Sequence, residues 1–74
     1  MLILVTGATG KVGRNFMARV LSTPSLGGVR LRALCHNRLV EATDRVEVIR
    51  GTISDRQTVT AALAGVTHVL HLAT

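Results

Sequence analysis

The sequence predicts an α/β fold built around a buried parallel sheet, and three observations support this prediction. The apolar residues 2–5 lead directly into a glycine-rich turn and then into a segment with helical periodicity. Strand and helix patterns alternate along the rest of the chain, which indicates parallel strands joined by right-handed crossovers. Apolar residues make up 47% of the 74-residue chain, yet Phe16 is its single Phe, Tyr or Trp residue. The core is therefore expected to consist of aliphatic side chains, as in a sheet that is buried on both faces.

The first strand is expected at residues 2–6 and the first helix at residues 11–22. The helix is predicted by apolar residues at helical spacing. They are Val12, Phe16, Met17, Val20 and Leu21. Pro24 ends the helix because proline cannot continue its hydrogen-bonded ladder, and residues 23–28 are expected to form a loop.

The middle of the chain predicts two further strands with no long helix between them. Residues 29–35 first alternate apolar and charged side chains and then become wholly apolar, which is typical of a strand that is buried at its end. Residues 36–45 form a connector, with one short helical turn expected near 39–42. The third strand is expected at residues 46–50.

The second helix is expected at residues 55–64. Ser54 and Gln57 have the spacing of a capping box, and Asp55 adds negative charge to the first turn. The apolar positions are Val59, Ala62, Leu63 and Val66. Gly65 is the expected stop, and residues 67–73 are expected to form the fourth strand.

This order of elements predicts the first half of a Rossmann-like doubly wound parallel sheet, with strand order 3-2-1-4. The chain is short for a domain, so residues 1–74 are interpreted as one incomplete nucleotide-binding unit.

The glycine-rich turn is the strongest functional signal. Gly7, Gly10 and Gly13 follow a strand and open a helix, so backbone N–H groups and the positive helix end are expected to face an anion. The amides of Lys11 and Val12 would point toward the phosphates of a nucleotide. The alternative is a strand-to-helix turn that binds no ligand.

The net charge is +5, from nine basic and four acidic residues. The arginines are scattered along the chain, and no aromatic residues lie between them to stack on bases. They are Arg14, Arg19, Arg30, Arg32, Arg38, Arg45, Arg50 and Arg56. This pattern predicts no nucleic-acid partner; the arginines are expected to form a solvated surface that also attracts a phosphorylated cofactor.

Cysteine and histidine residues predict neither a disulfide nor a metal site. Cys35 is the single cysteine and ends an apolar strand, so a buried and inert thiol is expected. His68 and His71 stand three apart in a strand and therefore face opposite sides. No stretch approaches the length of a membrane span, and no cleavable signal is expected before the first strand. The sequence therefore predicts a cytoplasmic protein without a membrane partner.

Three motifs together resemble the extended short-chain dehydrogenase/reductase family of the NAD-dependent epimerase/dehydratase type. They are Thr6-Gly7-Ala8-Thr9-Gly10-Lys11-Val12-Gly13, Gly51-Thr52-Ile53-Ser54-Asp55 and His68-Val69-Leu70-His71-Leu72-Ala73-Thr74. The resemblance covers essentially the whole chain. It implies a nicotinamide dinucleotide as cofactor, with Thr9 in the phosphate-binding turn and Ala73 near a cofactor ribose.

The resemblance also implies where the adenosine end of the cofactor would bind. The family holds the adenine amino group with an acid after the third strand, but Thr52 stands at that position here, which weakens this contact. Ile53 is expected to border adenine, and Asp55 is expected to start the following helix.

The residues after the second strand favour NADP over NAD as the cofactor. An NAD-binding protein places an acid there, roughly 20 residues past the glycines, whereas this sequence has no acid until Glu41. Arg38 is well placed for a 2′-phosphate, and His36 and Lys11 are expected to assist. An ordinary exposed arginine remains the alternative for Arg38.

No catalytic residue is expected in this chain. The family's chemistry is implied to use a Tyr-x-x-x-Lys pair, but the chain has no tyrosine and Lys11 is its single lysine. We therefore interpret it as the dinucleotide-binding fragment of an oxidoreductase, epimerase or dehydratase that acts on an alcohol or ketone, such as a nucleotide sugar. Two alternatives remain: a non-catalytic NADP-sensing regulator, or a small remnant or interaction module. An uncovered fourth strand also predicts self-association.

Overall fold

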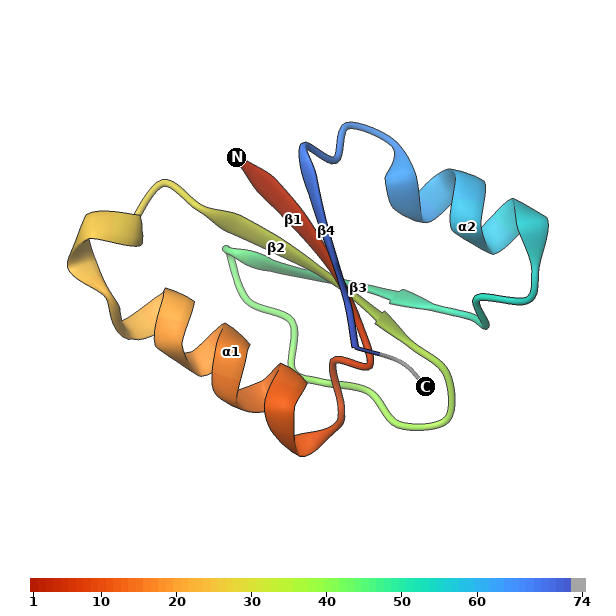
Figure 1. Ribbon diagram of the computed structural model, residues 1–74, viewed down its shortest axis with the longest axis horizontal. Helices are drawn as coiled ribbons and strands as arrows, with labels where there is room; N and C mark the ends of the chain where they lie inside the picture. Colours follow the sequence, from red (N-terminus) through yellow and green to blue (C-terminus); the bar gives the residue numbers. More distant parts are fainter. Residues whose placement is uncertain (73–74) are drawn as a thin grey trace.

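The computed structural model describes residues 1–72, which form one four-stranded parallel sheet with the strand order β3-β2-β1-β4 (Figure 1). The predicted fold class and strand order are thus confirmed. The elements are β1 (Leu2–Thr6), α1 (Lys11–Ser22), the 3-10 helix η1 (Pro24–Leu26), β2 (Arg30–Cys35), β3 (Val46–Arg50), α2 (Arg56–Leu63) and β4 (His68–His71).

The direction of each crossover decides which face of the sheet each helix covers. The chain moves outward from β1 through β2 to β3 and then returns to β4 on the other side of β1. Because crossovers are right-handed, this reversal places α2 on the face opposite α1, as Figure 1 shows. Residues 36–45 cross from β2 to β3 without a helix, and Val40 of this connector packs against the core on the α1 face.

The two faces bury cores of different size. On the α1 face, Met17 and Val20 pack on Val5, Leu31 and Ala33 of the two central strands. On the α2 face, the buried cluster is limited to Leu4, Leu34 and Ala62, with Ile49 and Val66 packed against it. Most of the hydrophobic stabilisation therefore comes from the α1 face.

The buried stripe of α1 differs from the prediction at one end. Val12 is 65% exposed, so its expected place in the core was wrong. The buried residues of α1 are Gly13, Met17 and Val20, which follow the spacing i, i+4, i+7 of one helix face. Glycine has no apolar side chain, so the apolar spacing in the sequence did not identify Gly13 as the first buried position.

Helical turns also form at different places from those expected. Residues 39–42 contain no helix, whereas the expected loop at 23–28 contains η1. Pro24 occupies the first turn of η1, where its fixed φ suits a helix and its missing N–H has no helical partner to lose.

The N-cap of α2 is Asp55 rather than the expected Ser54. The Asp55 carboxylate accepts hydrogen bonds from the Gln57 backbone N–H at 3.2 Å and from the Thr58 hydroxyl at 2.8 Å. Asp55 was therefore correctly interpreted as a helix-start residue, but the expected capping box was wrong. Gly65, with a φ of +74°, follows the helix as predicted, and Leu63, expected in the apolar stripe, is 45% exposed.

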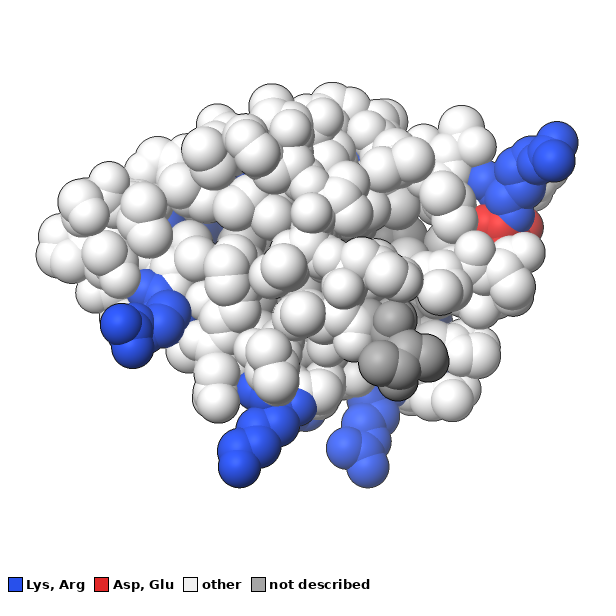
Figure 2. All heavy atoms as spheres, in the orientation of Figure 1, with Lys and Arg blue, Asp and Glu red and all other residues white. Residues whose placement is uncertain are grey.

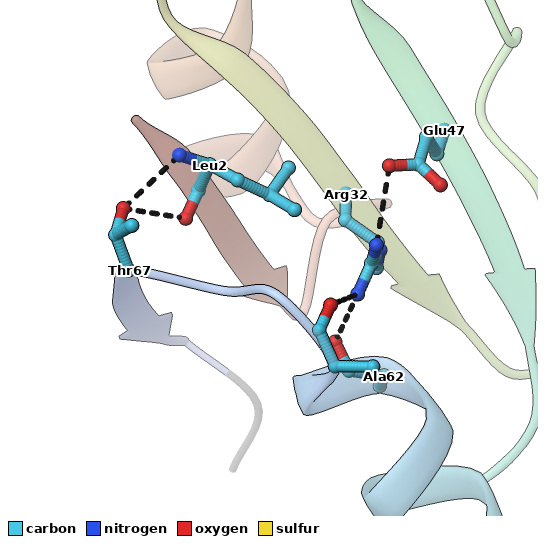
Figure 3. Close-up of polar contacts among 6 residues, drawn as sticks. Leu2, Arg32, Glu47, Ala62 and Thr67 are labelled. Atoms are coloured by element: carbon cyan, nitrogen blue, oxygen red, sulfur yellow. Dashed lines mark hydrogen bonds and ion pairs between the residues drawn. The ribbon is translucent and has the colours of Figure 1, made fainter.

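Two arginines that were expected in solvent instead anchor helix ends to the sheet. The Arg32 side chain is 12% exposed and projects from β2 toward the C-terminal end of α2 (Figure 3). Its Nη1 donates to the carbonyls of Ala62 at 2.8 Å and Ala64 at 2.6 Å, and its Nη2 pairs with Glu47 at 3.3 Å. Arg45 similarly donates to the carbonyls of Leu21, Leu26 and Val29.

A matched pair of arginine substitutions in β2 tests this anchoring role. We expect Arg32→Met to lower the free energy of unfolding by about 1–3 kcal/mol, because charge-assisted bonds to the end of α2 are lost. Arg30→Met, at an exposed position of the same strand, is expected to change it by less than about 0.5 kcal/mol. If urea denaturation showed the same decrease in the free energy of unfolding for both variants, the anchoring role would be contradicted.

Candidate functional site

A cleft of about 520 Å³ lies across the carboxyl ends of β1, β2 and β3. It lies beside the point where the chain reverses direction in the sheet, the usual ligand position in doubly wound folds. Its lining comprises Thr6, Gly7, Thr9, Gly10, Leu34, His36, Asn37, Arg38, Gly51, Thr52 and Ile53. Of the predicted site residues, the structure thus brings together Gly7, Thr9, Gly10, His36, Arg38, Thr52 and Ile53.

The β1–α1 turn forms one wall of the cleft. Gly7 has a φ of +66°, which a residue with a side chain rarely adopts. The Gly10 N–H donates to the Gly7 carbonyl at 3.1 Å and closes the turn. Gly10 is the N-cap of α1, and no side-chain hydrogen bond caps this helix end. The positive end of α1 is therefore directed at the cleft without a competing side-chain acceptor.

Gly13 serves the site through packing rather than by lining the cleft. A Cβ at Gly13 would collide with the Gly7 carbonyl oxygen and lie 2.8 Å from the Ala8 Cα. This close approach holds the first turn of α1 against the glycine turn. Lys11 and Val12 are exposed in that first turn and do not line the cleft.

The loop after β2 forms a basic and polar wall. His36, Asn37 and Arg38 are all exposed and line the cleft. Asn37 was missed from the sequence, although it lies between two predicted site residues, because an isolated amide carries no charge signal. In Figure 2, basic side chains project from the lower edge of the molecule, and the acidic surface visible at the upper right lies against another basic side chain.

The third wall follows β3. The Gly51 N–H donates to the Cys35 carbonyl at 2.8 Å, which continues the β2–β3 pairing to the cleft. The Thr52 hydroxyl lies 3.0 Å from the Ser54 hydroxyl and accepts from the Ser54 backbone N–H at 3.3 Å. Ile53 presents an apolar side chain that is 48% exposed. This wall therefore combines a hydroxyl pair with an apolar surface.

A side-chain contact missed by the sequence joins the ends of β1 and β4. Thr6 Oγ1 lies 2.6 Å from His71 Nδ1 and accepts from the Leu72 N–H at 3.1 Å. Thr6 lines the cleft, so this contact fixes one of its edges. His68 points away and lies within hydrogen-bond distance of Thr67. Ala73, the remaining predicted site residue, lies outside the described residues.

Within residues 1–72 the structure contains neither a membrane-spanning helix nor a cluster of metal ligands. Over residues 1–72, no helix has the length and apolar character required to cross a membrane. The same residues contain no group of three or more His, Cys, Asp or Glu side chains arranged to hold a metal ion. Cys35 is buried, as predicted.

Comparisons with known proteins agree with this geometry. A model of the NAD dependent epimerase/dehydratase family matches residues 3–74. The chain is 43% identical over 65 residues to a (4-alkanoyl-5-oxo-2,5-dihydrofuran-3-yl)methyl phosphate reductase of Streptomyces griseus, covering 88% of this chain and 22% of the reductase.

Two solved structures from Agrobacterium tumefaciens have the same fold. A uronate dehydrogenase matches with a TM-score of 0.78 and 29% identity, over 96% of this chain and 25% of the dehydrogenase. A short-chain dehydrogenase/reductase superfamily protein with bound NAD matches with a TM-score of 0.75 and 32% identity, over 100% of this chain and 20% of that protein. The chain therefore spans about a fifth to a quarter of the length of these relatives.

The packing of Gly13 gives a test that needs no ligand. We expect Gly13→Ala to lower the free energy of unfolding by about 1–3 kcal/mol, because the methyl group overpacks the β1–α1 turn. Gly28→Ala is the matched control, since a Cβ there meets nothing within 4 Å. Thermal unfolding that shows no difference between the two variants would contradict the close approach of α1 to β1.

Proposed function

We propose that this chain, which belongs to the NAD dependent epimerase/dehydratase family, is the dinucleotide-binding N-terminal part of a longer oxidoreductase, epimerase or dehydratase. The cleft across the ends of β1–β3, with the uncapped N-terminus of α1 at its wall, is the observation that carries this proposal. When bound, the nicotinamide would supply hydride transfer at an alcohol or ketone carbon, such as that of a nucleotide sugar.

The residues present fit such a cofactor. Gly10 has no side chain, which keeps the turn open. A Cβ at this position would lie 3.3 Å from the Gly7 carbonyl oxygen and would begin to fill the turn. The amides at the start of α1, including those of Lys11 and Val12, would hold the diphosphate. Thr9 would lie beside it, while Thr52 and Ile53 would border the base.

We further propose that NADP binds more tightly than NAD. Arg38 and His36 line the cleft beyond the phosphate-binding turn, and no Asp or Glu belongs to its described lining. A guanidinium forms strong charge-assisted bonds with a phosphate dianion. The 2′-phosphate of NADP would therefore gain contacts, whereas an acid to accept from the 2′-hydroxyl of NAD is absent from this lining.

The acid–base residues of the proposed reaction would come from another part of the longer protein. The 74 residues contain no tyrosine, and Lys11, their single lysine, lies at the start of α1. The segment by itself would bind the cofactor without turnover. If the longer protein also lacks a Tyr-x-x-x-Lys pair, a nucleotide-sensing function is favoured over an enzyme.

Calorimetric titration with NADP and NAD tests the cofactor proposal. We expect Arg38→Gln to weaken NADP binding about tenfold or more, because a hydrogen bond to a charged group contributes ~1.5–3 kcal/mol. NAD binding should stay within about twofold, because NAD lacks the 2′-phosphate. Arg56→Gln, an exposed position in α2 outside the cleft lining, is the matched control.

The phosphate-binding turn is tested in the same titration. Gly10→Val places a branched side chain at the cleft wall and is expected to abolish binding of both dinucleotides. Absence of binding by the wild-type chain, when circular dichroism shows that it is folded, would refute the proposed function. Equal affinities of the wild-type chain for NADP and NAD would refute only the NADP preference.

The isolated segment would also associate with a second copy of itself through β4. This strand pairs only with β1 in the described sheet, so its outer backbone groups form an open edge. Val69, on this strand, is 54% exposed, and Ile53 and Leu63 add exposed apolar surface around an adjoining hollow of about 250 Å³.

Sedimentation equilibrium tests this association. We expect a concentration-dependent dimer for the wild-type segment and a monomer for Val69→Lys, because a charged edge residue opposes strand pairing. Leu39→Lys, at 52% exposure in the β2–β3 connector, is the matched control and should remain dimeric. A monomeric wild-type segment at all concentrations would contradict the proposal.

A further inference from the structure

The order of strands in the sheet assigns one end of the cleft to the base of the dinucleotide, if the proposed function holds. The ends of β1, β2 and β3 stand in a row, and the N-terminus of α1 marks the diphosphate position beside β1. Arg38 follows β2, so the base would reach the loop after β3. Thr52 and Ile53 line the cleft there.

We propose that this end of the cleft accepts a purine whether its 6-position carries an amino or a carbonyl group. The side chain available there for the purine edge is the Thr52 hydroxyl. A hydroxyl both donates and accepts hydrogen bonds, whereas a carboxylate accepts only. Among the described lining residues none is Asp or Glu, so no side-chain carboxylate in this lining selects an amino group over a carbonyl.

The contact between Thr52 and Ser54 explains how one hydroxyl serves both purines. Thr52 Oγ1 already accepts from the Ser54 backbone N–H, and it lies 3.0 Å from the Ser54 hydroxyl, where either oxygen donates. When Thr52 donates to Ser54, its second lone pair is open to an amino group. When the Ser54 hydroxyl donates to Thr52 instead, the Thr52 O–H points away from Ser54 and is available to donate to the carbonyl of a 6-oxopurine. Reversal of one hydroxyl pair therefore adapts the wall to either base.

The apolar part of this wall does not distinguish the two bases either. Ile53 is 48% exposed, and Leu34 lies in the cleft lining beside it. Both residues also line the adjoining hollow of about 250 Å³. A purine ring packed on these side chains would be bound through its faces, which are alike in adenine and hypoxanthine. Asn37, another polar lining residue, both donates and accepts, and Arg38 is assigned to the ribose phosphate rather than to the base.

Calorimetry with two dinucleotides tests this proposal. The probes are NAD and nicotinamide hypoxanthine dinucleotide, which differ at the 6-position of the purine, amino against carbonyl, and in the proton that hypoxanthine carries on N1. We expect their dissociation constants for the wild-type chain to agree within about threefold, since the wall pairs with both edges. A wild-type preference for NAD of tenfold or more would overturn the proposal while leaving nucleotide binding established.

Two isosteric variants assign the effect to Thr52. Thr52→Asp provides an acceptor without a donor, so NAD should be favoured over the hypoxanthine analogue by about tenfold or more. Thr52→Asn has the same shape but keeps both a donor and an acceptor, so the ratio should stay within about threefold. Because each result is a ratio for one variant, a general loss of affinity or stability cancels.

The remaining outcomes separate this proposal from the proposed function. An unchanged ratio in Thr52→Asp, with the variant shown to be folded, would refute the assignment to Thr52. If Thr52→Asp does not fold, the wild-type ratio alone decides the proposal. Failure of both dinucleotides to bind a folded wild-type chain would refute the proposed function, and this inference with it.

Discussion

The close approach of α1 to the end of β1 is the constraint on which the rest of the structure depends. Gly13 packs on the Gly7 carbonyl and Ala8 at a distance that no side chain permits. This contact sets the angle at which α1 leaves the central strand. It therefore decides both where Met17 and Val20 enter the core and where the positive helix end meets the cleft. One packing contact thus couples stability on the α1 face to the chemistry at the strand ends.

The cleft also depends on the reversal of the chain at β1. Strands β2 and β3 lie on one side of β1 and β4 lies on the other, so the loops after β1, β2 and β3 gather at one edge of the sheet. Each loop contributes a different chemistry: backbone N–H groups after β1, basic and amide side chains after β2, and hydroxyl and apolar side chains after β3. A ligand that matches this order has an anion at one end and a flat heterocycle at the other. That description fits the proposed dinucleotide.

The smaller core on the α2 face explains the role of Arg32. Leu4, Leu34 and Ala62 form a small buried cluster, which by itself provides little hydrophobic stabilisation for α2. Arg32 supplements it from β2 by binding the last carbonyls of α2, where positive charge is favourable at a helix C-terminus. On the other face, Arg45 donates to the carbonyls of Leu21, in the last turn of α1, and of Leu26, in η1. Part of the chain's net positive charge is therefore structural, and the part that remains exposed near the cleft includes Arg38.

The sequence by itself determined the features that depend on neighbouring residues. The alternation of strands and helices, the glycine turn and the presence of Asp55 at the start of α2 follow from local apolar spacing, glycine and short-range polar contacts, and the structure shows each of them. The tertiary structure alone decided features that join distant residues. Thr6 meets His71 across 65 positions, and Arg32 meets Ala62 across 30; Val12 is exposed because Gly13 takes its place on the sheet. The physical reason is that strand pairing and helix packing bring these groups together. A pattern within a few neighbouring residues does not identify the distant partner of a polar side chain.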